Sequence, residues 1–220
     1  MFTTKKYLMI ATAAIVLSCS NTENNNPARS TIQITETVHA AEQQKPKTFY
    51  QLLADTALGL INPSIVYDPA YVQLTYPGGD VAPDKGVCTD VIIRAYRKMG
   101  IDLQKEVHED MTKNFSLYPA KWGRRTPDKN IDHRRVPNLM TFFTRKGKSI
   151  PVSNNATDYL PGDIVTWNLS NGMTHIGLVV DKKSADKERY LLLHNIGGGQ
   201  VLADCLFSYE ITGHYRYNKM

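Results

Sequence analysis

The chain has 220 residues, of which 42% are hydrophobic and 21% are charged, and its formal net charge is +5. This length fits one compact domain with an adequate hydrophobic core. The positive charge is small, and no Lys/Arg block or aromatic-interleaved basic stripe is present, so we expect no nucleic-acid partner.

The first segment, residues 1–18, has the pattern of an export signal. Its sequence "MFTTKKYLMIATAAIVLS" has two lysines followed by an uncharged run over residues 7–17, which is too short to span a membrane. Cys19 follows "VLS", which resembles the lipobox of bacterial lipoproteins, so we expect cleavage before Cys19 and its lipidation. Ordinary secretion, with cleavage near Ala40, is the alternative. Lipidation predicts an exported domain, anchored to a bacterial membrane, in the periplasm or on the cell surface.

Residues 19–48 are rich in Asn, Thr, Glu and Gln and poor in large apolar side chains, which is typical of a disordered tether. Removal of the signal takes away Lys5 and Lys6 and leaves 24 basic against 21 acidic side chains, a charge of +3. We place the folded domain at residues 49–220 and expect a monomer.

The first half of this domain is predicted to be mainly helical. The apolar spacing in "TFYQLLADTALGLI" predicts a helix that Asn62 and Pro63 end, and "AYVQLTYPGGD" predicts a short strand and a turn. A helix is predicted to begin at Cys88 in "GVCTDVIIRAYRKMG" and to end near Gly100. Residues 101–138 are expected to form loops and short helices. The segment "NLMTFFTRKG" is expected to form a brief helix that ends at Gly147.

The last third of the chain changes to the spacing of strands. The segments "DIVTWNL", "HIGLVVD", "YLLLHNI" and "GHYRY" are short, apolar and separated by turn-like sequence. Helices followed by a meander of strands predict an α+β fold, with N-terminal helices packed on a small antiparallel sheet.

Cys88 is the candidate nucleophile. At the first turn of a helix, unpaired N–H groups and the helix dipole lower a thiol pKa, which favours the reactive thiolate. His175 begins a predicted strand after a turn and is the candidate base. A third residue is needed to orient the base, and the candidates are His194 and Asn195. Two registers of the predicted hairpin are possible: one pairs residue 175 with residue 195, and the other pairs it with residue 194.

These features are similar to a known family. The segments "YPGGDVAPDKGVCTDVIIRAYRKMGIDLQ", "NIDHRRVPNL", "PGDIVTW", "HIGLVVD", "LHNIGGG" and "ITGHYRY" resemble domain-of-unknown-function family 1287. That family comprises exported bacterial proteins of the NlpC-type papain-like cysteine peptidase superfamily. The resemblance covers residues 49–217 and implies a papain-like fold.

The resemblance implies that Cys88 is the nucleophile, His175 the base and His194 the orienting residue of a hydrolase that cuts amide bonds in peptidoglycan stem peptides. Cell-wall peptidases of this superfamily commonly have Asp before the cysteine and Ser-Gly after it, whereas here Val87 precedes Cys88 and Asp90 follows Thr89. Asp90 is therefore a candidate substrate contact. A non-catalytic cell-wall-binding module and a papain-like acyltransferase are the alternatives.

The segment "NIDHRRVP" supplies further candidate substrate contacts, namely Asp132, His133, Arg134 and Arg135. A pair of arginines is suited to binding a substrate carboxylate. The alternative is a loop held together by ion pairs.

Two other hypotheses compete with the nucleophile. Export permits a disulfide between Cys88 and Cys205, although Cys205 lies among apolar residues and is expected to be a buried small side chain. A metal site built from Cys88, His133, His175 and His194 lacks any short, regular ligand spacing, so we expect no metal and no cofactor.

Overall fold

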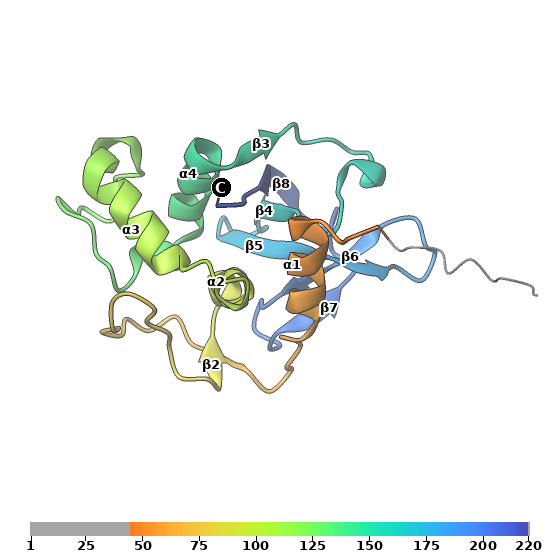
Figure 1. Ribbon diagram of the computed structural model, residues 1–220, viewed down its shortest axis with the longest axis horizontal. Coiled ribbons are helices and arrows are strands. Elements are labelled where there is room, and N and C mark those ends of the chain that lie inside the picture. The colour runs from red at the N-terminus through yellow and green to blue at the C-terminus, as the bar shows by residue number, and fades with distance from the viewer. Residues whose placement is uncertain (1–44, 220) are drawn as a thin grey trace, which may run out of the picture. The chain divides into compact units, whose positions relative to one another are not determined.

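A computed structural model of the protein describes residues 45–219 (Figure 1), so the expectations for residues 1–44, including lipidation of Cys19, lie outside the described residues. The described chain forms an α+β domain around a six-stranded antiparallel sheet with the strand order β3-β8-β4-β5-β6-β7. The strands are β3 (Lys148–Ile150), β4 (Ile164–Asn168), β5 (Thr174–Lys183), β6 (Tyr190–His194), β7 (Val201–Ala203) and β8 (Glu210–Arg216). Strands β1 (Val66–Tyr67) and β2 (Lys85–Gly86) form a separate parallel pair.

The helices lie mainly before the sheet in the chain. They are α1 (Phe49–Leu58), α2 (Cys88–Lys98), α3 (Leu103–Asn114) and α4 (Val136–Lys146), with short 3-10 turns η1 (Phe115–Leu117), η2 (Asp132–Arg134) and η3 (Ala156–Asp158). Helices α1 and α2 both pack against β5, the long strand in the middle of the sheet (Figure 1). The predicted fold class, helices packed on a small antiparallel sheet, is confirmed.

The two faces of β5 belong to different parts of the core. Because side chains alternate along a strand, Ile176, Leu178 and Val180 point to the helices, whereas Val179 packs on the opposite face with Trp167. On that second face, the indole N–H of Trp167 donates to the carbonyl of Leu206 at 2.9 Å. The sheet is therefore buried on both faces at its centre, which fixes β5 firmly in the domain.

Helix α1 begins with a capping box in which Thr48 and Gln51 bond to each other's backbone N–H groups. Helix α2 ends just before Gly100, whose φ of +78° suits a glycine, as the sequence predicted. The expected apolar face of α1 is only partly correct, because Leu53 and Ala57 are fully buried but Leu52 and Ile61 are each 43% exposed.

Three local predictions are wrong. Residues 70–75 form no strand, and residues 103–114 form the 12-residue helix α3 where only loops and short helices were expected. Strands β3 and β7 were not predicted.

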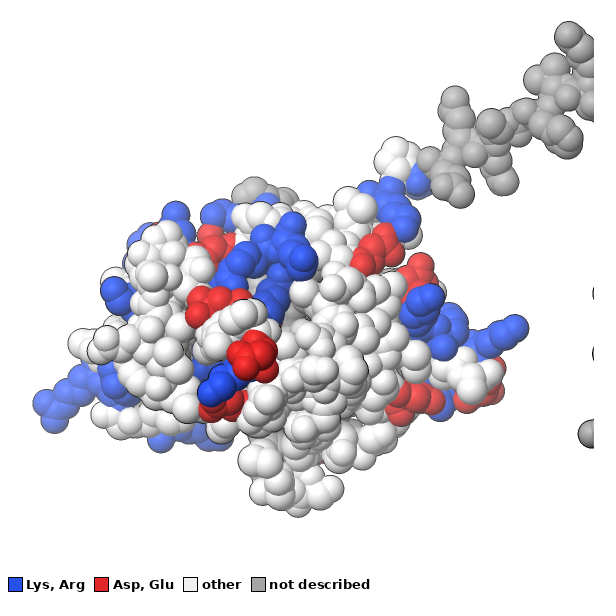
Figure 2. Space-filling view, turned by 90° about the horizontal axis from the view of Figure 1, so that it is seen from below, with Lys and Arg blue, Asp and Glu red and all other residues white. Residues whose placement is uncertain are grey.

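The surface on the β2 side of the molecule carries Lys, Arg, Asp and Glu side chains next to one another, with uncharged surface between them (Figure 2). Lys85 of β2, for example, pairs with Asp68 at 2.7 Å. Among the described residues, no helix is long and apolar enough to cross a membrane.

Candidate active site

Cys88 is the first residue of α2 and is 5% exposed. Its helix start is fixed by Asp90, whose carboxylate accepts the N–H of Val87 at 2.7 Å. Cys88 lines a cavity of about 490 Å³ together with Tyr67 and Val87, so the buried thiol faces a space large enough for part of a peptide.

Burial, with a smaller contribution from the negative charge of Asp90, raises the pKa of the Cys88 thiol to about 12. Hydrogen bonding from the backbone N–H groups of Ile176, Thr89 and Cys88 itself lowers it, but by less. The expectation that the helix start gives this thiol a low pKa is therefore wrong, because desolvation of the thiolate outweighs the helix N–H groups. The contact with the amide of Ile176 places the sulfur at the start of β5. The side chain of the preceding residue, His175, packs with Trp167 on the sheet face opposite to the helices, and His175 does not line the cavity.

His175 and His194 form a buried pair. Nε2 of His175 lies 2.8 Å from Nδ1 of His194, and the His175 ring also packs against Trp167, with 5.7 Å between ring centroids and 31° between the ring planes. The two histidines are only 3% and 4% exposed. Their hydrogen bond uses one nitrogen of His175 and leaves Nδ1 for another partner.

The register of β5 and β6 explains why His194 and not Asn195 meets His175. Leu178 pairs with Leu193, and this register sets residue 175 opposite residue 196, so neither predicted register is correct. His194 lies diagonally across from His175 on the same face of the sheet. Asn195 points the other way and donates to the carbonyl of Gly86 at 3.2 Å.

Both imidazoles are held in their neutral form. Burial lowers the pKa of His175 to about 3, with a smaller effect from His194, and burial also lowers the pKa of His194. Among the hydrogen bonds of residues 45–219, none joins Cys88 to His175. The described site thus combines a neutral thiol and a neutral imidazole on adjoining elements.

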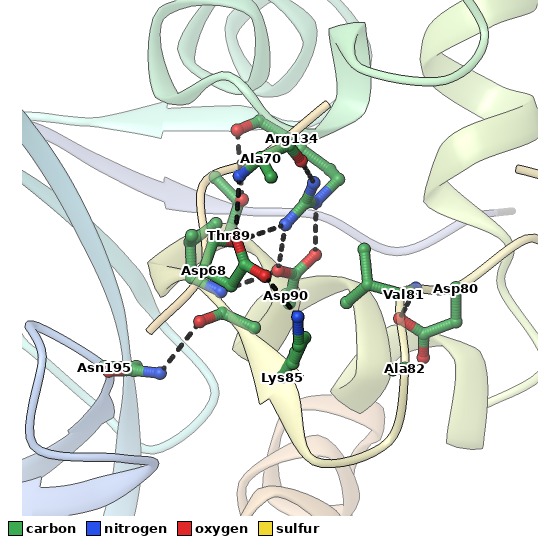
Figure 3. Close-up of polar contacts among 12 residues, drawn as sticks. Asp68, Ala70, Asp80, Val81, Ala82, Lys85, Thr89, Asp90, Arg134 and Asn195 are labelled. Carbon is green, nitrogen blue, oxygen red and sulfur yellow. Dashed lines mark hydrogen bonds and ion pairs between the residues drawn. The ribbon is translucent and has the colours of Figure 1, made fainter. Parts of the chain in front are cut away.

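Asp90 and Arg134 form a buried ion pair (Figure 3). The guanidinium of Arg134 donates through Nε and Nη2 to the two oxygens of Asp90, each at 2.9 Å, and both side chains are 2% exposed. Because Asp90 also accepts from Val87, its carboxylate has no free surface, and it does not line the cavity. The expectation that Asp90 contacts substrate is not supported by this geometry.

Arg134 also ties a distant segment to the site. Its remaining N–H groups reach the carbonyls of Asp68 and Ala70, at 3.4 and 3.3 Å, and its own carbonyl accepts from Thr89 at 3.1 Å (Figure 3). The segment that follows β1 is thereby held beside the start of α2. Arg134 is therefore committed to protein partners rather than to a substrate.

The other residues of "NIDHRRVP" are placed differently from one another. Asp132 is buried, accepts the N–H of Asp128 at 2.5 Å and pairs with Nη1 of Arg135 at 2.9 Å. His133 is 2% exposed, and burial lowers its pKa to about 3. Asp132 and His133 do not line the cavity with Cys88, so the geometry does not support their expected substrate contacts, whereas Arg135 does line it.

Tyr67, Lys121 and Trp122 are among the cavity residues that the sequence analysis did not identify as candidates. Burial raises the pKa of Tyr67 to about 12, and the nearby Cys88 contributes to the rise, which places the phenol close to the thiol. The only signal in the sequence was the aromatic and basic character of "LYPAKWG", which carries no spacing typical of a site.

Within the described residues, Cys88 and Cys205 are both free, so the disulfide between them is contradicted. Cys205 is buried next to Trp167 and Leu206, as expected for a small core side chain. No group of three or more His, Cys, Asp or Glu side chains in residues 45–219 is arranged to hold a metal ion.

Comparisons with known proteins agree with the family expected from the sequence. The family model "Domain of unknown function (DUF1287)" matches residues 54–217. An uncharacterized protein of Escherichia coli (strain K12), YijF, is 54% identical over 179 residues, which cover 78% of this chain and 87% of YijF. The chain therefore belongs to the DUF1287 family.

A search of solved structures found NlpC1 from Trichomonas vaginalis. It is 18% identical with a TM-score of 0.44, and the match covers 80% of this chain and 47% of NlpC1, so the chain spans about half the length of that protein.

Proposed function

We propose that this protein is a thiol hydrolase that cleaves amide bonds in peptidoglycan stem peptides. The observation that carries the proposal is the bond between His175 and His194 on strands that contact α2, the helix that begins with Cys88 at the cavity. A nucleophile, a base and a group that orients the base are the parts that thiol hydrolysis requires.

The hydrogen bond between the histidines fixes their tautomers in this mechanism. If Nδ1 of His175 accepts the thiol proton, the ring proton of His175 is on Nε2, which then donates to Nδ1 of His194. His194 thus keeps His175 in the tautomer that acts as a base, and its own proton is on Nε2.

The reaction begins from neutral groups. Because the pKa of Cys88 is about 12 and that of His175 about 3, the proton moves from sulfur to His175 only as the sulfur attacks the substrate carbonyl. The N–H groups of Cys88 and Thr89 at the start of α2 then hold the developing oxyanion. Protonated His175 delivers the proton to the leaving amine, and water releases the acyl group from Cys88.

The location is part of the same proposal. The signal and the lipobox-like "VLS" before Cys19 support export and lipid anchoring, with the domain in the periplasm or on the cell surface. A lipid-anchored domain on that side of the membrane has access to cell wall.

The test is incubation of the purified protein with muropeptides, followed by mass spectrometry of the products. We expect new peptide fragments with the wild type and none with Cys88→Ala. Equal turnover by the two proteins would refute Cys88 as the nucleophile, and a product that carries a transferred acyl group would indicate an acyltransferase instead.

The raised pKa of Cys88 favours a second candidate function, a cell-wall-binding module that has the cavity but no activity. Such a module would retain muropeptides equally as the wild type and as Cys88→Ser, and would release no fragments. Fragment release that depends on Cys88 excludes it.

A further inference from the structure

The cavity beside Cys88 is lined by basic residues and by no acidic residue. Lys121, Arg134 and Arg135 contribute to its wall, together with the indole of Trp122. The cavity is thus a place where an anionic group finds favourable charge without a competing carboxylate in the wall.

The three basic side chains differ in how many hydrogen-bond donors they have free for a ligand. Arg134 uses four of its five N–H groups on Asp90 and on two backbone carbonyls, and its side chain is only 2% exposed, so it has little to offer a ligand. Lys121 is exposed and forms no ion pair or hydrogen bond within residues 45–219. Arg135 uses only Nη1, on Asp132, and its side chain is 17% exposed.

Trp122 fixes the orientation of Arg135. The guanidinium carbon lies over the Trp122 ring, 4.1 Å from its centroid, and this cation–π contact holds the group against the indole. A guanidinium held in this way loses little freedom when it forms further hydrogen bonds. Asp132 offsets part of its charge, but that carboxylate is buried and outside the cavity wall.

We infer that the cavity binds a carboxylate of an acidic peptide through Lys121 and the free N–H groups of Arg135, over the ring of Trp122. Cys88 lines the same cavity, so an acidic residue bound there brings a neighbouring amide bond to the space that the thiol faces. A volume of about 490 Å³ is within the range of sites that hold small ligands. The inference rests on the proposed function for the choice of peptide, but not on turnover.

Binding to the full-length chain with Cys88→Ala separates recognition from chemistry. The probes are the tripeptide L-Ala-γ-D-Glu-L-Lys, amidated at its C-terminus, and the same tripeptide with the glutamyl α-carboxyl group also amidated. Quenching of tryptophan fluorescence reports occupancy, because Trp122 is 37% exposed at the cavity and Trp167 is fully buried. We expect the acid to bind about tenfold more tightly than the amide, since a hydrogen-bonded charge contributes more than a neutral contact.

Substitutions then assign the preference to residues. Lys121→Gln and Arg135→Gln each reduce the preference for the acid to about threefold or less, whereas Lys105→Gln, on exposed α3 surface outside the cavity, leaves it unchanged. Arg135 also pairs with Asp132, so Arg135→Lys serves as a second variant that preserves the charge and loses the planar donor array.

Equal binding of the acid and the amide would overturn the inference, even if the wild type hydrolyses muropeptides. A preference for the acid that survives Lys121→Gln and Arg135→Gln together would also overturn it. If the acid is preferred through these two residues but no hydrolysis occurs, the carboxylate site stands and the proposed hydrolase fails.

Discussion

At Cys88 and His175, desolvation acts on two groups of opposite charge type and leaves both neutral. It raises the pKa of the thiol to about 12 and lowers the pKa of the imidazole to about 3. A preformed thiolate–imidazolium pair is therefore not the ground state of this site. The reactivity of the thiol has to come from proton transfer during attack.

The first prediction concerns the rate at which iodoacetamide alkylates Cys88. Because the thiol pKa is about 12, we expect the rate to keep rising with pH from 7 to 10 without a plateau. The measurement is mass spectrometry of the peptide that contains Cys88. The peptide that contains Cys205 is the internal reference, because burial raises the pKa of that thiol as well, to about 11. A plateau near pH 6 would contradict the burial argument.

The second prediction concerns His194. His194→Leu removes the acceptor that fixes the tautomer of His175, so we expect kcat on muropeptides to fall by about 100-fold with little change in KM. His194→Asn can still accept through its amide oxygen and should retain more activity than His194→Leu. Asn195→Ala is the matched control, because Asn195 bonds to Gly86 and not to His175. Activity that falls more in Asn195→Ala than in His194→Leu would show that the orienting residue is misassigned.

Sequence reasoning found Cys88, His175 and His194 as candidates but could not choose between His194 and Asn195. Which of the two residues faces His175 depends on the pairing register of β5 and β6, because successive side chains of β6 point to opposite faces of the sheet. That register changes between Val179 and Lys183, so the pairing at the hairpin end differs from the pairing in the rest of the two strands. Nothing in the residues of that hairpin, rich in charged side chains, encodes the position of such an irregularity. The protonation states were unpredictable for a related reason, since they depend on burial by segments distant in the chain.

At the scale of elements, the ion pair of Asp90 and Arg134 joins α2, η2 and the segment after β1. Asp90 also holds the N–H that precedes Cys88, so this pair positions the nucleophile, and of its two members only Arg134 borders the cavity. Because each partner is 2% exposed, removal of either one leaves an uncompensated buried charge.

The third prediction follows from that burial. Arg134→Leu should lower the free energy of unfolding by about 3 to 5 kcal/mol, since it leaves the carboxylate of Asp90 unpaired. Adding Asp90→Asn should recover part of the loss, because the unpaired charge is then gone. The control is Lys105→Ala, in an exposed pair with Glu109, which should cost less than about 0.5 kcal/mol. Urea unfolding followed by circular dichroism measures all three, and a loss in Arg134→Leu as small as in Lys105→Ala would contradict the prediction.

The wrong prediction for residues 70–75 has a physical cause at this scale. The β-branched and aromatic residues there are largely exposed, with Tyr71 at 55% and Val72 at 42%. The backbone is bonded to side chains instead of to a strand, since Asn130 accepts from the N–H of Leu74 and Gln104 donates to the carbonyl of Thr75. Those partners come from residues far along the chain, so local sequence could not reveal them.

Helix α3 was missed because of its composition. Its sequence is dominated by polar and charged residues, and only Leu103, Val107 and Met111 form a buried stripe at intervals of four. The stripe and the N-cap from Asp102, which accepts from Gln104, were both readable in principle. The fold class was predictable because the four main strands are apolar and follow the helices in the chain.

At the scale of the whole molecule, the domain buries several neutral histidines in separate places. His133 lies in η2, whereas His175 and His194 lie on the sheet, and burial lowers the pKa of all three. In the unfolded chain these rings titrate near pH 6.5. The native state therefore binds fewer protons than the unfolded state at mildly acidic pH, which makes folding stability depend on pH.

The last prediction follows from the sign of these shifts. A histidine whose pKa is lower in the folded state than in the unfolded state does not reduce the free energy of unfolding above about pH 6.5. As the pH falls from 6.5 toward the pKa of the folded state, which is about 3 for His133 and His175, the unfolded chain takes up protons that the folded domain does not, and stability is lost. At pH 5, His133 and His175 should each cost about 2 kcal/mol relative to pH 7, at 1.4 kcal/mol per pH unit. Asp110, whose pKa is lowered to about 2 by its cationic and tyrosine partners, adds a further loss only below about pH 4.

Urea unfolding at pH 7 and at pH 5 measures the effect. We expect the wild type to lose several kcal/mol between the two, and His133→Asn to lose about 2 kcal/mol less than the wild type over the same interval, whatever its stability at pH 7. The comparison within each protein separates the proton-linked loss from any packing defect that the substitution introduces. Equal stability of the wild type at pH 7 and pH 5 would mean that the native domain accepts these protons, by opening the segments that bury the histidines.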